Sequence, residues 1–285
     1  MGLITRAVVR ISPVPEKERF QAVFLPDWTQ GLEAVRDMIR ARLPLSMLRL
    51  SDAAETATTL ILAGHERLVR LLERFLRTRG LDKDKCMLIF GATGSPEAVR
   101  HTVRDGLEIA RSRGGVYVGR RMGSEWRRSR FRAPYLRNTL WDSGYGVDTL
   151  ESAFTWKDLP AAAAAVLDGL RTALDGEREK ALAFAHVSHV YRTGASLYFT
   201  VIFRLAAGAE ETLERWRSLK RAASLAVVSH GGTISHQHGV GVDHLPYLEA
   251  EKGRLGMRAL RSLFRTFDPR GMMNPGKLVD GGKRR

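Results

Sequence analysis

Cysteine is almost missing from this 285-residue chain, in which Cys86 stands alone. A single thiol excludes an intramolecular disulfide framework and is typical of a reducing compartment. Because Cys86 precedes the apolar run at residues 87–90, we expect its thiol to be buried and inert. The chain also lacks the run of ~20 apolar residues that spans a bilayer, and its beginning lacks the pattern of a secretory signal. These absences lead us to expect a cytoplasmic protein.

Acidic residues are scarce relative to basic ones, with 31 Asp and Glu against 46 Lys and Arg and a formal net charge of +15. Such a positive field attracts phosphates, carboxylates, nucleic acid or an anionic membrane surface. The sequence has no helix-turn-helix, zinc finger or aromatic stacking motif, so we expect no nucleic-acid partner. We expect a small-molecule or lipid substrate that carries a phosphate or carboxylate. Peripheral contact with an anionic membrane and a homodimer both stay open.

Apolar periodicity predicts strands that alternate with helices. The strand pattern occurs at residues 20–25, 46–50, 86–90, 147–154, 182–189 and 196–205. The helical pattern occurs at residues 28–43, 65–76, 96–113, 159–174 and 210–228. With two hairpin-like adjacencies, this order predicts an α+β fold in which a mostly antiparallel sheet is covered on one face by helices. A doubly wound parallel sheet is the alternative.

Residues 229–241 resemble a functional site more than any other segment, because they hold three of the eight histidines among several glycines. Imidazole changes its charge near neutral pH, and glycine permits positive φ or a close backbone approach. If the segment is extended, His236 and His238 aim their rings along one face. A glycine-rich hairpin with solvent-facing histidines is the alternative.

A second candidate site is rich in arginine and has aromatic residues in between. Guanidinium groups match phosphate and carboxylate oxygens, but a charge run of this kind is also typical of a solvated basic helix. The last arginine follows Pro134 and precedes the strand at 147–154, where we expect a functional arginine to be held against a sheet edge. The arginines are Arg120, Arg121, Arg127, Arg128, Arg130, Arg132 and Arg137.

A third candidate site lies on the strands at 182–189 and 196–205. Strand alternation places His186 and Ser188 on one face and His189 on the other. The same alternation places Tyr198 on the face away from the most apolar residues of its strand. Tyr198 is then either a surface aromatic or a proton-transfer group, if a positive neighbour lowers the pKa of its phenol.

A zinc site is a further alternative, because five histidines fall in the two segments around 186–189 and 230–238. A catalytic zinc needs three protein ligands and an open position, and second-shell carboxylates normally orient the histidines. The first carboxylate to follow His236 and His238 in sequence is Asp243. We therefore predict no metal.

Three segments together identify a family. Residues 188–200, 231–241 and 267–277 resemble, in this order and spacing, the C-terminal cap domain of FAD-linked oxidases. Within that superfamily the resemblance is strongest to the alkyldihydroxyacetonephosphate synthase family, which carries consecutive histidines before Gly-Val-Gly. The glycolate oxidase and D-lactate dehydrogenase branch has Gly-Glu-His there. Residues 44–52 and 135–151 also resemble the synthase pattern, so the resemblance covers nearly the whole chain and implies a ferredoxin-like cap domain.

The resemblance also assigns the domains. Residues 1–11 read as a β-branched strand that has no partner nearby in sequence. The resemblance implies that residues 1–15 are the last strand of an FAD-binding domain whose remainder lies upstream. Residues 16–285 are then the cap domain, and we expect this chain alone to bind FAD weakly or not at all and to be catalytically incomplete.

Residue by residue, the resemblance implies the chemistry of the synthases. Tyr198 is the proton-abstracting tyrosine, and Arg137 lies near the reactive edge of the flavin as a catalytic and substrate-binding residue. Arg49 matches an arginine that the synthases need and is assigned to substrate binding. The reaction exchanges acyl for alkyl at the first carbon of an acylated dihydroxyacetone phosphate, in ether-lipid synthesis, with the flavin as electrophile.

The resemblance implies FAD as the cofactor. His236 and His238 would line the site beside the flavin ring, as catalytic and cofactor-binding residues, and Asn274 would contact the flavin. One position departs from the synthase pattern, because Gln237 stands where the middle histidine is expected, and glutamine cannot shuttle a proton. An FAD-linked 2-hydroxyacid oxidase or dehydrogenase is therefore the alternative. A non-enzymatic basic module that binds phosphate or nucleic acid is the second alternative.

Overall fold

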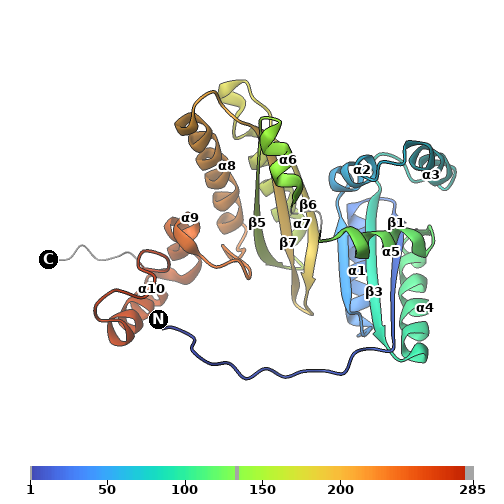
Figure 1. The fold of residues 1–285 in the computed structure, drawn as a ribbon, viewed down its shortest axis with the longest axis horizontal. Coiled ribbons are helices and arrows are strands. Elements are labelled where there is room, and N and C mark those ends of the chain that lie inside the picture. Colours follow the sequence, from blue (N-terminus) through green and yellow to red (C-terminus); the bar gives the residue numbers. More distant parts are fainter. Residues whose placement is uncertain (1, 132–134, 280–285) are drawn as a thin grey trace.

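The computed structural model describes residues 2–131 and 135–279. At its centre lies a seven-stranded sheet with the order β4-β1-β3-β2-β6-β7-β5 (Figure 1). All six pairs of neighbouring strands are antiparallel, so the predicted α+β fold is confirmed and the parallel alternative is wrong. The strands are β1 (Lys17–Leu25), β2 (Met47–Ser51), β3 (Cys86–Gly94), β4 (Val116–Tyr117), β5 (Tyr145–Thr155), β6 (Leu182–Val190) and β7 (Gly194–Arg204).

Helices cover both faces of the sheet, so the expectation that they cover only one face is wrong. The predicted helices lie close to their expected ranges, but several others were missed, α2 and α10 among them. The alanine- and threonine-rich α2 gives little periodic signal, and α10 contains Gly253 at φ 66°, which interrupts the helical pattern. The helices are α1 (Trp28–Arg40), α2 (Ala53–Leu62), α3 (Glu66–Thr78), α4 (Pro96–Ser112), α5 (Arg120–Ser129), α6 (Leu136–Asp142), α7 (Leu159–Thr172), α8 (Ala209–Ser229), α9 (Gly241–His244) and α10 (Leu248–Phe267).

The sheet consists of two units that follow one another in the chain. The first unit runs β1-α1-β2 and β3-α4-β4, and its spatial order β4-β1-β3-β2 is ferredoxin-like. The second unit repeats this pattern as β5-α7-β6-β7-α8, with the order β6-β7-β5. The units join where Leu50 of β2 pairs with Val187 of β6. Among the described residues no strand lies beyond β5, which is therefore an edge of the sheet.

The two faces of the sheet differ in what covers them. On one face α1, α4, α7 and α8 pack over a continuous apolar core that includes Leu88, Phe90 and Phe199. On the other face, α2, α3 and α5 cover the half that contains β1, β3 and β2, and α2 also reaches β6, over a smaller core around Phe24 and Leu76. Each fully buried side chain of this size contributes about 1.5–3 kcal/mol. The β6–β7–β5 half of the second face carries polar side chains instead.

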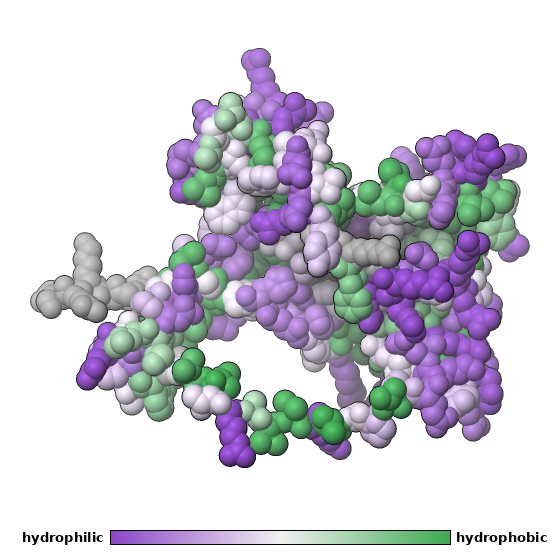
Figure 2. All heavy atoms as spheres, viewed as in Figure 1, coloured by the Kyte–Doolittle hydropathy of each residue, from purple (hydrophilic) through white to green (hydrophobic). Residues whose placement is uncertain are grey.

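Residues 2–15 form no strand, so the predicted strand at residues 1–11 is wrong for the described part of this segment. The segment is exposed along its length, including Ile4, Val8 and Ile11. Figure 2 shows its green apolar side chains separated from the sheet. A strand needs a neighbour for its backbone hydrogen bonds, and none of the described strands pairs with this segment. The division into residues 1–15 and 16–285 stays a prediction.

The arginine-rich segment is largely a helix, α5, that packs on β1. Trp126 contacts Phe20 with ring centroids 5.9 Å apart, and Arg127 forms an ion pair with Glu18. The arginines of α5 are exposed, as the solvated-helix interpretation expects, while one face of the helix packs on β1 and Arg132 lies outside the described residues. Cys86 is buried as predicted, and burial raises the pKa of its thiol. Among the described helices, none has the length and apolar character needed to cross a membrane.

Candidate active site

A row of polar residues crosses four neighbouring strands on the uncovered part of the second face. Ser51 of β2 pairs with His186 of β6, His186 pairs with Tyr198 of β7, and Tyr198 pairs with Glu151 of β5. Residues that lie directly opposite one another in a sheet have side chains on the same face. The row therefore faces away from α7 and α8, and the predicted orientation of Tyr198 and His186 is confirmed.

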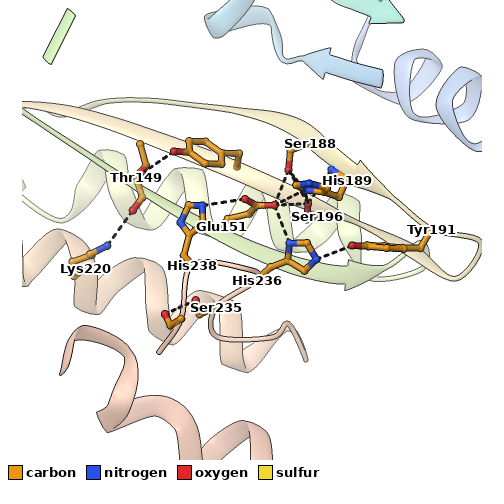
Figure 3. A network of polar contacts seen from close by, with 12 residues as sticks. Thr149, Glu151, Ser188, His189, Tyr191, Ser196, Lys220, Ser235, His236 and His238 are labelled. Carbon is orange, nitrogen blue, oxygen red and sulfur yellow. Dashed lines mark hydrogen bonds and ion pairs between the residues drawn. The ribbon is translucent and has the colours of Figure 1, made fainter. Parts of the chain in front are cut away.

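Glu151 is the centre of the polar network in Figure 3. Glu151 is only 4% exposed, and its Oε1 accepts hydrogen bonds from Ser188 Oγ at 2.8 Å and from Ser196 Oγ at 2.7 Å. Burial raises its pKa, but hydrogen bonds from two serines and two histidines outweigh burial and lower the pKa to about 2. Glu151 is therefore ionised at neutral pH.

Three histidines from two segments surround this carboxylate. The Nδ1 atoms of His189 and His236 lie 3.0 and 2.9 Å from Oε1, and His238 Nε2 lies 3.2 Å from Oε2. On its other side, His236 Nε2 lies 2.9 Å from the hydroxyl of Tyr191. The carboxylate thus fixes the ring positions of all three histidines.

Tyr198 lies between two imidazoles. Its ring stacks on His186 with centroids 5.1 Å apart and an interplanar angle of 18°, and the ring of His238 meets it edge-on at 5.4 Å. Its hydroxyl donates to Thr149 Oγ1 at 3.1 Å. The two imidazole rings thereby limit access to the phenol ring of Tyr198. The Thr149 hydroxyl beside the phenol oxygen can also act as a hydrogen-bond donor.

A second buried carboxylate lies at the other end of the row. Glu55 of α2 contacts Arg49 Nη2 at 2.8 Å and His186 Nδ1 at 3.0 Å through the same oxygen, Oε1. Burial raises the pKa of Glu55, but the contacts with His186 and Arg49 outweigh it and lower the pKa to about 2. Burial lowers the pKa of His186, so we assign a neutral ring that donates from Nδ1 to Glu55.

Two cavities lie along β5, the edge strand of the sheet. The first, of about 690 Å³, is lined by His238, Thr149, Lys220 and Asn274 among others. His244 also lines it, and its buried Nδ1 has no hydrogen-bond partner among the described residues. The second cavity, of about 670 Å³, has Arg137 beside the apolar side chains of Trp141, Phe203, Leu213 and Trp216. The two cavities share Asp148 and Asp243 in their linings.

The sequence model of the FAD linked oxidases, C-terminal domain, matches residues 14–278. The chain belongs to this family. The predicted family is confirmed, and with it an FAD-linked enzyme as the class of protein to which this domain belongs.

Three known proteins show where the similarity lies. The chain is 26% identical to the alkyldihydroxyacetonephosphate synthase of Trypanosoma brucei brucei over 98% of its own length and 46% of that protein. The same identity and coverage hold for the Dictyostelium discoideum synthase. A solved alkyldihydroxyacetonephosphate synthase superposes with a TM-score of 0.71 at 20% identity, over 90% of this chain and 44% of that chain. The chain thus spans less than half the length of the curated relatives it matches.

Within this FAD-linked oxidase domain, the structure brings together most of the predicted site residues. Tyr198, His236 and His238 lie in one network, and Asn274 lines the same cavity as His238. The remaining two are Arg49, which joins the row through Glu55 and His186, and Arg137, which lies in the second cavity and outside the network. The roles of these residues stay predictions.

Two expectations about the histidines are wrong. A register shift between Val187 and Val190 lets Ser188 and His189 both reach Glu151, so His189 does not point to the opposite face. Residues 233–240 are a loop and not an extended strand, with Gln237 in the left-handed region at φ 60°. The two rings flanking Gln237 nevertheless reach the same carboxylate, one on each oxygen.

Glu151 and Glu55 were not predicted as site residues. The nearest carboxylate considered was Asp243, but Glu151 reaches His236 across 85 positions and Glu55 reaches His186 across 131. One signal was present in the sequence, because Glu151 is a charged residue inside the predicted strand at 147–154, beside the apolar Leu150. Gln237 is exposed, and no hydrogen bond of its side chain is seen among the described residues.

Proposed function

We propose that this chain is the cap domain of an FAD-dependent enzyme of the alkyldihydroxyacetonephosphate synthase type. The enzyme would exchange acyl for alkyl on an acylated dihydroxyacetone phosphate. The observation that carries the proposal is the placement of Tyr198 between His186 and His238, in a chain that is similar to the synthases over 98% of its length. Similarity to a glycolate oxidase subunit of Bacillus subtilis covers 48 residues only.

Tyr198 would take the proton from the first carbon of the substrate. A phenol acts as a base only as phenolate, and hydrogen bonds to its oxygen favour that form. The Thr149 hydroxyl lies 3.1 Å from the Tyr198 oxygen and can turn to donate. Ionised Glu151 holds His236 and His238 in place, so that their rings are positioned before the substrate arrives.

The flavin ring of FAD would lie against the first cavity. The unpaired Nδ1 of His244 is a buried polar atom that a bound group can satisfy, and His238, Asn274 and Lys220 line the same space. FAD would supply an electrophilic flavin ring. His238 and Asn274 would hold the ring, and the FAD-binding domain is the protein partner that we propose for residues 1–15.

Different residues would bind the phosphate group and the apolar chain of the substrate. Arg137 lies at one side of the second cavity, next to the apolar Trp141 and Phe203, so this cavity suits a ligand with an anionic group and an apolar chain. Arg49 is held by Glu55, and its remaining donors can reach a phosphate or carboxylate.

An anionic membrane surface is the second partner that we propose, with α3 as the contact. Leu68, Leu71 and Phe75 of α3 are exposed. The helix carries four arginines against two glutamates, which is the composition of a helix that lies on an anionic surface. A membrane contact suits a lipid substrate. A homodimer stays a prediction of the sequence.

The decisive experiment joins this chain to an FAD-binding domain of the family and offers two substrates. We expect incorporation of labelled fatty alcohol into acyl-dihydroxyacetone phosphate, and no reduction of the flavin by glycolate or D-lactate. If a 2-hydroxyacid reduces the flavin and no alcohol is exchanged, the synthase proposal is wrong and the enzyme is an FAD-linked oxidase or dehydrogenase. Tight phosphate binding with neither reaction would support a binding module instead.

A further inference from the structure

Glu55 and Tyr198 belong to different units of the sheet, and the ring of His186 lies between them. His186 of β6 pairs with Ser51 of β2 on one side and with Tyr198 of β7 on the other. Glu55 Oε1 lies 3.0 Å from His186 Nδ1, and the imidazole stacks on the phenol of Tyr198 with ring centroids 5.1 Å apart. A carboxylate of the first unit therefore reaches the proposed base of the second unit through one ring.

The plane of the His186 ring depends on Glu55. Rotation of an imidazole about its last side-chain bond is broad and roughly two-fold, so the strand alone does not decide which nitrogen faces the carboxylate. Among the described residues, Glu55 is the one hydrogen-bond partner of this ring. Burial lowers the pKa of His186, so the ring is neutral and carries one N–H. The ionised carboxylate selects the tautomer with the N–H on Nδ1 and holds the ring nearly parallel to the phenol.

Glu55 is itself fixed in place by its surroundings. It lies in the first turn of α2, where its backbone N–H donates to Asp52 Oδ1 at 2.7 Å. Asp52 Oδ2 accepts from the backbone N–H of Ala185 at 2.8 Å, one residue before His186. Arg49 Nη2 contacts Glu55 Oε1 at 2.8 Å from β2. The start of α2 is thus bound to β6 directly beside the ring that its carboxylate holds.

We propose that Glu55 is a positioning residue for Tyr198 that acts through the ring of His186. This role rests on the function proposed above, in which Tyr198 removes the proton of the substrate. Glu55 fixes the imidazole against one side of the phenol, while His238 meets the phenol edge-on. Because a misplacement of ~1 Å can cost about 100-fold in rate, the orientation of the His186 ring affects kcat.

NMR of the chain alone tests the positioning. We expect the ¹⁵N shifts of His186, assigned by their loss in His186→Asn, to show one neutral tautomer with the N–H on Nδ1 at pH 7. Glu55→Met removes the acceptor, so both tautomers should be populated and the ring protons of Tyr198 should shift. Glu55→Gln keeps an acceptor oxygen and should retain the Nδ1–H tautomer. An Nε2–H tautomer in the unchanged chain would overturn the proposal, whether or not the variants fold.

The rate of the assembled enzyme tests the consequence. At saturating substrate, Glu55→Met should lower kcat at least ~10-fold, and Glu55→Gln should restore most of it. Saturation removes any effect of Arg49 on substrate affinity. Glu73→Met is the matched control, because Glu73 of α3 forms an ion pair at 3.1 Å with the buried Lys85. This variant should also lose stability, but the Tyr198 shifts and kcat should not change.

The outcomes separate the role of Glu55 from the enzymatic function. If the unchanged assembled enzyme exchanges no alcohol, the synthase is refuted, and the NMR shifts still decide whether Glu55 orients His186. Unchanged Tyr198 shifts in folded Glu55→Met would overturn the proposal. An equal loss of kcat in Glu55→Met and Glu73→Met would also overturn it, because the loss would then follow stability alone.

Discussion

Glu151 decides the geometry of the candidate active site, because both of its oxygens engage histidines from a distant loop. Oε1 lies 2.9 Å from His236 and Oε2 lies 3.2 Å from His238. Gln237, the residue that departs from the synthase pattern, is exposed between them. The change from histidine to glutamine at position 237 therefore affects the exposed side of the loop. The two histidines that contact Glu151 are those that the synthase pattern predicts.

Removal of the Tyr198 hydroxyl tests the proposed base. In the assembled enzyme, Tyr198→Phe should lower kcat by at least ~100-fold, since general-base catalysis contributes about 10²–10⁴-fold. The ring contacts with His186 and His238 remain, so the thermal stability should hardly change. The control is Tyr145→Phe, at the partly exposed start of β5. If Tyr198→Phe has the same kcat as the unchanged enzyme, a group other than Tyr198 removes the proton.

Neutralisation of Glu151 tests its structural role. Glu151→Gln puts an amide where serine and histidine donors converge, so we expect the free energy of unfolding to fall by about 1–3 kcal/mol. Urea unfolding at pH 7 measures this loss. Glu210→Gln changes an exposed carboxylate on α8 and should have little effect. Equal stability of the two variants would show that Glu151 does not hold the network.

At the scale of elements, a close approach after α8 positions the loop at residues 233–240. A Cβ on Gly232 would lie 2.3 Å from the Phe154 ring, and Thr233 N, just beyond, donates to Ala153 O at 3.1 Å. The backbone of the loop is thus pressed against β5, which brings His236 to Glu151.

Gly232→Ala should therefore displace this loop. We expect a loss of about 1–3 kcal/mol in the free energy of unfolding, because the added methyl group overpacks the contact with Phe154. Urea unfolding gives the loss, and NMR shifts of the His236 ring report the displacement. Gly176→Ala is the control, because nothing lies within 4 Å of its added Cβ. Unchanged His236 shifts would contradict the prediction.

The exposed face of α3 predicts binding to anionic vesicles. The double variant Leu68→Glu/Leu71→Glu should abolish co-sedimentation with vesicles of phosphatidylcholine and phosphatidylserine, because it removes apolar contact and adds negative charge. Leu225→Glu makes a similar change at an exposed leucine of α8 and should sediment as the unchanged chain does. If the unchanged chain binds pure phosphatidylcholine equally well, charge does not select the membrane.

At the scale of the whole molecule, two buried carboxylates make stability depend on pH. The pKa values of Glu55 and Glu151 are lowered to about 2, so the unfolded chain takes up their protons first as the pH falls. The free energy of unfolding should decline between about pH 4.5 and pH 2, by up to about 3 kcal/mol for each carboxylate. Urea unfolding over a pH series measures the decline, and Glu55→Gln should make it shallower.

Other buried groups make the free energy of unfolding depend on pH at higher pH values. Burial lowers the pKa of His186 and His244, so both should reduce stability as the pH falls below the range in which unfolded histidine titrates. Burial raises the pKa of Asp52 to about 6, so Asp52 acts in the opposite direction and its contribution is lost as the pH rises through 6. A stability that is constant from pH 7 to pH 2.5 would contradict these assignments.

The sequence by itself determined the family, the α+β class, most helices and strands and the face on which Tyr198 lies, because periodicity and motif order are properties of neighbouring residues. Only the tertiary structure decided which carboxylates contact the histidines and on which face of the sheet His189 lies. Glu151 meets His236, and Glu55 meets His186, only after the strands pair in their register and a bulge turns His189. Such contacts depend on long-range pairing, which no local pattern of residues specifies.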